Sequence, residues 1–216
     1  MNSDIAVWEQ AMAGPPGFCL TFVQDRTPRE VLGAYTPRST DASLLTLAEA
    51  RQALRPPYTV SLLRAGQVGS WSFCFEDDLP EGFKPRVLQR LSTGTNVIQV
   101  IRGGDGLNTV QRLRCGRQIE FFEPVYRPTL RGDGPHILFG EARDAASRHP
   151  ERLPLYVTLA VIGQRIGGVV DLALLEGPLL TAFLADSDRE SSRPQLSAPL
   201  SPKARGLGRL LGPMQT

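Results

Sequence analysis

Short runs in which apolar residues alternate with small or polar ones constrain this chain more than any other feature. Successive side chains of a strand point to opposite faces of a sheet, so such alternation indicates strands and not helices. Between residues 58 and 124 the runs are "YTVSLLRAGQVGSWSFCFEDD", "NVIQVIRG" and "TVQRLRCGRQIEFFEP". The first predicts a hairpin around Ala65 to Val68, and the last predicts a hairpin around Cys115 and Gly116. Together the runs predict one antiparallel sheet.

A similar run near the amino terminus, "FCLTFV", predicts a central strand. It places Phe18, Leu20 and Phe22 on one face, and it places Cys19 and Thr21 on the other. Both faces of this strand can therefore be covered by other elements.

Two helix starts share the same capping residues. Thr27 stands three residues before Glu30, and Thr46 stands three residues before Glu49. A threonine hydroxyl accepts a hydrogen bond from a free amide of the first turn, while the glutamate bonds back to the cap. Helices are therefore predicted after Thr27 and after Thr46. Two more stretches have helical periodicity, "SDIAVWEQAMAG" and "KPRVLQRLST".

The second half of the chain has a weaker pattern. Residues 125–149 contain "RPTLRGDGP", which is typical of a loop. The stretch "ERLPLYVTLAVIGQRIGG" predicts a buried helix that stops near Gly163, and "VVDLALLEGPLLTAFLA" predicts a second helical piece with Asp171 as its cap. Residues 186–216 are rich in Ser, Pro, Gly and charge and predict a disordered tail.

The predicted fold is therefore α+β: one antiparallel sheet of about five or six strands, flanked by amino- and carboxy-terminal helices. Residues 1–185 are expected to form a single domain.

Composition makes several classes of protein less favoured. The formal charge is only +2, from 24 basic and 22 acidic residues, so the chain lacks the field expected of a nucleic-acid-binding protein. No signal peptide and no bilayer-spanning segment are expected, which predicts a cytoplasmic protein. Cys19, Cys74 and Cys115 are far apart and are interpreted as buried, reduced side chains.

The stretch "GSWSFCFEDD" contains the best candidate for a functional carboxylate. Alternation puts Trp71, Phe73 and Phe75 on one face and Ser72, Cys74 and Glu76 on the other. Asp77 and Asp78 are interpreted as turn residues.

The candidate ligand-binding residues are few. On the face with small side chains they are Glu76, Ser72 and Thr21, while Arg112 and Arg114 share one face of a later strand and could meet an acidic partner or a phosphate. Each set also has a purely structural explanation. A helix could pack closely over the small side chains, and the arginines could lie on a solvated outer face of the sheet. No spacing typical of a metal site, a nucleophile elbow or a nucleotide-binding loop occurs, so no cofactor, metal or catalytic residue is predicted.

The order of five stretches resembles a known family. These stretches are "WEQ", "FCLTFVQDRTPREVLGAY", "GQVGSWSFCFEDD", "RVLQRLSTGTNVIQVIR" and "GRQIEFFEP". They are similar to a family of small actinobacterial proteins that carry a domain of unknown function. The resemblance implies a cytosolic α+β domain and an actinobacterial source. It implies no catalytic residue.

Two functions remain open at this point. The leading hypothesis is a non-enzymatic protein-interaction or regulatory module in a bacterial conflict, immunity or signalling system, with a protein partner. The alternative is a small-ligand-binding protein or enzyme whose pocket lies near Glu76. Nucleic acid is a less favoured partner and a membrane is not expected.

Overall fold

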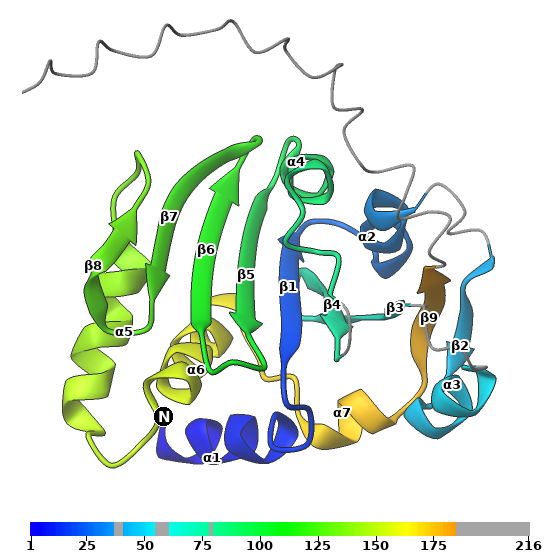
Figure 1. Cartoon of the computed structure of the whole chain (residues 1–216), viewed down its shortest axis with the longest axis horizontal. Coiled ribbons are helices and arrows are strands. Elements are labelled where there is room, and N and C mark those ends of the chain that lie inside the picture. The colour runs from blue at the N-terminus through cyan, green and yellow to red at the C-terminus, as the bar shows by residue number, and fades with distance from the viewer. Residues whose placement is uncertain (37–40, 55–60, 78–79, 185–216) are drawn as a thin grey trace, which may run out of the picture.

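A nine-stranded antiparallel sheet forms the framework of the protein (Figure 1). The computed structural model describes residues 1–36, 41–54, 61–77 and 80–184. In these residues the strand order is β2-β9-β3-β4-β1-β5-β6-β7-β8. The strands are β1 (Phe18–Gln24), β2 (Ser43–Leu45), β3 (Ser61–Val68), β4 (Trp71–Glu76), β5 (Asn96–Arg102), β6 (Asn108–Arg114), β7 (Arg117–Glu123), β8 (Tyr126–Arg131) and β9 (Leu179–Leu184). The α+β class and the antiparallel sheet are confirmed, but the prediction of five or six strands is wrong.

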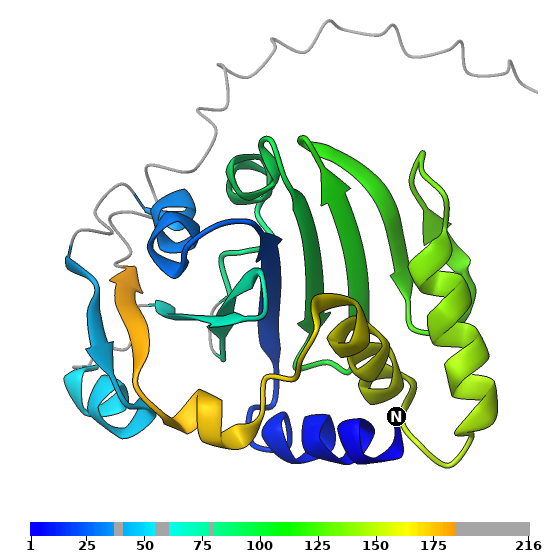
Figure 2. The ribbon, with the colours of Figure 1, turned by 180° about the vertical axis from the view of Figure 1, so that it is seen from behind.

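Helices accompany both faces of the sheet. They are α1 (Asn2–Ala11), α2 (Pro28–Tyr35), α3 (Leu47–Ala53), α4 (Pro85–Ser92), α5 (Ile137–Arg148), α6 (Pro154–Ile166) and α7 (Leu172–Glu176). Figure 2 shows α1, α5 and α6 in front of the sheet in the view from behind. None of the helices in the described part of the chain is both long and apolar enough to cross a bilayer.

Alternation along the strands divides the core into two layers. Phe18 and Phe22 of β1 and Phe73 of β4 belong to the larger cluster, together with residues of α1, α5, α6 and α7. Val23 and Cys74, from the opposite faces of the same strands, pack with residues of α2 and α4. The predicted central position of the first strand is confirmed, because β1 pairs with β4 on one side and with β5 on the other.

Both predicted capping boxes are present. The Thr27 hydroxyl accepts from the Glu30 amide at 3.3 Å, and the Glu30 carboxylate accepts from the Thr27 amide at 2.8 Å. Thr46 and Glu49 make the same pair of bonds. The local sequence thus determines where α2 and α3 begin.

The predicted position of one hairpin turn is wrong. Residues 65–68 belong to β3, and the chain turns at Gly69, whose φ is +58°. Gly66 is required by packing and not by a turn, because a Cβ atom there would lie 2.7 Å from the Phe73 ring. The second hairpin, around Cys115 and Gly116, is confirmed by the pairing of β6 with β7.

The carboxy-terminal half departs most from the sequence-based predictions. The stretch interpreted as a loop contains β8 and leads into α5. The predicted helix over 169–185 is only partly correct: Asp171 caps α7, accepting from the Leu174 amide at 2.7 Å, but Gly177 and Pro178 end the helix and β9 follows. The predicted helix stop at Gly163 is wrong, since α6 continues to Ile166 and is ended by Gly167, which adopts a left-handed conformation. The predicted disordered tail lies outside the described residues.

A buried arginine connects the carboxy-terminal segment to the sheet. Arg64 of β3 is 1% exposed, and its guanidinium donates to the main-chain oxygens of Leu175, of Leu45 at 3.0 Å and of Gly177 at 2.7 Å. Two of these oxygens lie at the end of α7, where carbonyl groups lack helical partners. Burial lowers the pKa of Arg64 from its ordinary value, but an arginine side chain stays charged in proteins.

Replacing Arg64 by methionine should destabilise the fold by about 3 kcal/mol or more, because three main-chain oxygens in buried or partly buried contacts would lose their donor at about 1–3 kcal/mol each. Urea denaturation measures the effect. Arg114→Met, at an exposed position of β6, is the matched control and should change the free energy of unfolding by less than about 0.5 kcal/mol. Equal stabilities of the two variants would contradict the bridging role of Arg64.

Candidate functional site

The Glu76 carboxylate is fully buried at the end of β4. Its oxygens accept hydrogen bonds from the Glu81 amide at 2.6 Å, from the Gly82 amide at 3.2 Å and from the Tyr35 hydroxyl at 3.2 Å. The two amides belong to the loop that leads from β4 to α4, while Tyr35 is the last residue of α2. The carboxylate is therefore covered by a loop and by a helix end.

The groups around Glu76 are uncharged or titrate far from neutrality. Burial raises the pKa of Glu76 from 4.5 to about 7, although the amide bonds oppose this effect. Burial also raises the pKa of the thiols of Cys19 and Cys74 and of the Tyr35 hydroxyl well above their ordinary values. Both thiols are thus neutral at pH 7, and a neutral thiol is a weak nucleophile.

Gly82 closes the space above the carboxylate. A Cβ atom at this position would lie 2.6 Å from a Glu76 oxygen, 2.7 Å from the Tyr35 hydroxyl and 3.2 Å from the Cys19 sulfur. Real atoms do not approach so closely, so the loop packs here only because residue 82 lacks a side chain. A ligand would have to displace this loop to reach Glu76.

A row of polar side chains extends from this cluster across four strands. Gln99 of β5 donates to the Thr21 hydroxyl of β1 at 2.9 Å, and Gln111 of β6 donates to the Gln99 oxygen at 2.6 Å. Gln118 of β7 donates in turn to Gln111 at 2.9 Å. Each buried amide is thus satisfied by its neighbour, which is the condition for a polar layer inside a core.

The predicted site residues on this face are only partly brought together. Thr21 contacts Cys19 at 3.7 Å and so adjoins the Glu76 cluster. Ser72 is buried on the same face, but its hydroxyl donates to the Arg26 carbonyl oxygen. Asp77 does not face Glu76: it pairs with Arg51 at 3.1 Å, as expected of a residue beyond the strand end. Asp78 lies outside the described residues.

Arg112 and Arg114 lie on the other face of the sheet, away from Glu76. Arg112 pairs at 2.8 Å with Glu120, whose carboxylate is buried and accepts from the Phe139 amide at 2.7 Å at the start of α5. Arg114 is exposed near the hairpin turn. For Arg112, the predicted acidic partner is therefore Glu120 of the same chain.

Sequence reasoning missed Tyr35, Gln99 and Gln111. The small and polar side chains of β1 and β4 suggested an open space, but long side chains from α2, β5 and β6 occupy it. One signal was available: Gln99 interrupts the apolar run "NVIQVIR", at a position buried between neighbours. The prediction that all three cysteines are buried is confirmed for Cys19 and Cys74, but Cys115 is exposed.

A second feature is an apolar groove at one end of the sheet. It has a volume of about 600 Å³ and lies where β3 and β9 diverge beyond the pairing of Ala65 with Leu180. Its walls come from the start of α2 (Pro28), from β2 (Leu44) and from the residues that lead into β9 (Pro178). Leu44 is 69% exposed, the largest exposed fraction among the large apolar side chains of the described residues.

A change of Glu76 to glutamine should alter how stability depends on pH. Between pH 4.5 and about 7 the folded chain retains a proton on Glu76 that the unfolded chain has lost, so the stability of the native protein falls as pH rises through this window. At about 1.4 kcal/mol per pH unit the fall attributable to Glu76 is about 3 kcal/mol. Denaturation of both proteins at a series of pH values measures it. Parallel curves for the two proteins would show that Glu76 titrates normally.

Replacing Gly82 by alanine should destabilise the protein by about 1–3 kcal/mol, because the added methyl group overpacks the space around Glu76. Gly104→Ala is the matched control, since a Cβ atom there meets nothing within 4 Å. Thermal denaturation compares the two. If Gly82→Ala were as stable as the control, the loop would not be sealed against the carboxylate.

Residues 5–144 match the Family of unknown function (DUF6461). No curated protein and no solved structure matches the chain. The matched segment includes Glu76 and each residue that donates to its carboxylate. The resemblance to a family with a domain of unknown function is thus confirmed, while the actinobacterial source and the cytosolic location stay predictions. Since the matched segment is more than half of the 216 residues, this chain belongs to the Family of unknown function (DUF6461).

Proposed function

We propose that the protein is a non-enzymatic interaction module that binds an extended, apolar segment of another protein along the outer edge of β2. The observation that carries this proposal is the exposed Leu44 side chain beside the apolar groove. Exposed apolar surface next to unpaired strand atoms is the usual setting for recognition by strand addition.

The two outer strands differ in how they are protected. In the described residues β2 and β8 are the ends of the sheet. The exposed residues of β8 include Arg127 and Pro128, and charge and proline are the features that protect edge strands from pairing. The residues of β2 are Ser43, Leu44 and Leu45, with neither charge nor proline. This contrast favours β2 as the edge that accepts a partner.

The groove indicates the chemistry of the partner. Leu44 pairs with Leu180, so both side chains lie on the same face of the sheet, and both line the groove. A strand added outside β2 would place alternate side chains on this face. The partner segment should therefore carry apolar residues at every second position. Because β2 has only three residues, we infer a weak or transient complex in which the groove supplies most of the affinity.

The ligand-pocket alternative near Glu76 is less well supported, because Glu76 is fully buried and is bonded by the loop above it. A conflict, immunity or signalling setting stays a prediction from the sequence.

Selection from a random peptide library tests the proposal. Enriched peptides should carry apolar residues with a period of two, and a synthetic peptide should bind Leu44→Lys at least about tenfold more weakly than the native protein, because a charged side chain would lie against the apolar segment. Fluorescence polarisation measures both affinities. Leu107→Lys, at another exposed leucine, is the matched control and should bind normally.

Three results would overturn the proposal. The first is enrichment of peptides with helical periodicity, and the second is the absence of any enrichment. The third is a stable dimer of the protein itself, observed by light scattering and lost in Leu44→Lys, which would assign the edge to a second copy of the chain.

A further inference from the structure

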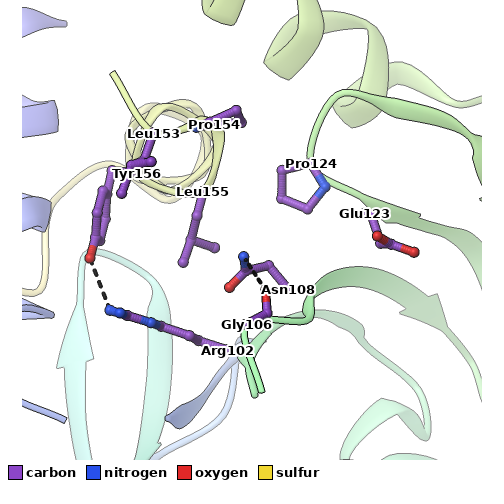
Figure 3. Close-up of a pocket in the computed structure, with 9 residues that line it drawn as sticks. All are labelled: Arg102, Gly106, Asn108, Glu123, Pro124, Leu153, Pro154, Leu155 and Tyr156. Carbon is purple, nitrogen blue, oxygen red and sulfur yellow. Dashed lines mark hydrogen bonds between the residues drawn. The ribbon is translucent and has the colours of Figure 1, made fainter. Parts of the chain in front are cut away.

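A pocket of about 260 Å³ lies between the start of α6 and the turn that joins β5 to β6 (Figure 3). It is on the opposite face of the sheet from the Glu76 cluster, on the side covered by α1 and α6. The wall from α6 is Leu153, Pro154, Leu155 and Tyr156, and the wall from the strands is Arg102, Gly106, Asn108, Glu123 and Pro124. Most of this lining is apolar, but three polar groups converge on it.

The first polar group is the guanidinium of Arg102, at the end of β5. Its Nη1 atom donates to the Tyr156 hydroxyl at 3.0 Å and to the Met12 carbonyl oxygen at 3.3 Å. These bonds hold the side chain in place and leave Nη2, the neighbour of Nη1, with no acceptor in the described residues, so that a single carboxylate oxygen can accept from Nη2 beside the Tyr156 hydroxyl. No described carboxylate forms an ion pair with Arg102. Within the part of the chain that the structure describes, this fixed and partly buried cation therefore lacks a counter-charge.

The second and third groups each lack one hydrogen-bond partner. Tyr156 is 6% exposed and accepts from Arg102, but in the described residues its own hydroxyl proton has no acceptor. The side-chain nitrogen of Asn108 donates to the Gly106 oxygen at 3.1 Å, whereas its buried Oδ1 atom has no donor. Figure 3 shows this oxygen directed toward Leu155 and the space beside Arg102. Leaving such a group unpaired costs about 1–3 kcal/mol.

The remaining charged residue of the lining does not compensate Arg102. Glu123 turns its carboxylate away from the guanidinium in Figure 3. The start of α6 adds to the positive potential, because the helix dipole points its positive end at this wall and no side chain caps the helix.

We propose that this pocket binds a small organic carboxylate that carries a hydroxyl or an amino group next to its carboxyl carbon. The carboxylate would accept from Arg102 and from the Tyr156 hydroxyl, and the hydroxyl or amino group would donate to Asn108 Oδ1. Leu155, Pro154 and Pro124 provide apolar contacts for a short carbon chain. This site is separate from the groove at β2 and shares no residue with it.

Titration with three acids of similar size tests the proposal. Lactate and alanine carry the additional donor, as hydroxyl and ammonium respectively, and propionate lacks it. At least one of the two should bind with a dissociation constant of about 1 mM or lower, as expected of a good ligand with so few atoms. Propionate should bind at least about tenfold more weakly, because it leaves Asn108 Oδ1 unpaired. Shifts of the Asn108 side-chain and Tyr156 amide signals in protein NMR spectra report the binding and its location.

Single-residue variants measure how much each residue of the pocket contributes to binding of the acid. Arg102→Gln should abolish binding, and Tyr156→Phe, which removes only a hydroxyl, should weaken it about tenfold. Arg114→Gln, at an exposed arginine on the neighbouring strand, should bind normally. If Arg102→Gln does not fold, Tyr156→Phe still decides the question. Asn108→Asp should favour alanine over lactate relative to the native protein, because a carboxylate prefers an ammonium donor. An unchanged ratio of the two affinities would contradict the contact between the ligand donor and residue 108.

The proposal would be overturned if neither lactate nor alanine bound, if propionate bound as tightly as both, or if Tyr156→Phe left the affinity unchanged. Leu44→Lys should bind these acids normally. Failure of the peptide experiment and failure of this one are therefore distinguishable.

Discussion

Burial of the Glu76 carboxylate determines how one side of the sheet is assembled. A carboxylate removed from water requires hydrogen bonds or a proton, and here it receives two main-chain amides and a phenol hydroxyl. Those donors come from two segments: the loop before α4 and the end of α2. The loop and the helix must both be in place for the carboxylate to be satisfied, so the charge couples their positions. The glutamines of the neighbouring strands extend the same requirement across the sheet.

Arg64 has the corresponding role on the opposite face. Like Glu76, it forms no ion pair within the described residues, and main-chain oxygens from the end of α7 and from β2 accept its hydrogen bonds. The strand that follows α7, β9, lies between β2 and β3 although it is the last strand of the described chain. The guanidinium therefore holds the end of α7 against the sheet, and this segment leads directly into β9. One buried charge on each face holds non-local elements together, a task that apolar contacts perform with less directional specificity.

Local signals predicted the elements whose boundaries are set by neighbouring residues. The capping boxes at Thr27 and Thr46 and the alternation in β1 and β4 identified two helices and the two faces of the sheet. The prediction failed where distant contacts decide. β9 and β8 have sequences that are compatible with a helix or a loop, and they become strands only by pairing with β3 and β7. Likewise, alternation placed Glu76 on the correct face, but it gave no indication that Tyr35 and Gly82 would enclose it.

The two candidate binding surfaces share a property that the Glu76 cluster lacks. Each is built at the boundary between the family-matched residues 5–144 and the segment that follows them. The groove combines Leu44 with Leu180, and the pocket combines Arg102 with Tyr156. The hydrogen bonds to the Glu76 carboxylate, in contrast, all come from the matched segment, although β9 adds Ala182 and Leu184 to the apolar cluster on the same face. Docking of α6 and β9 thus completes both surfaces, and in the described residues each keeps an unmatched group: an exposed leucine at one, a guanidinium without a counter-charge at the other.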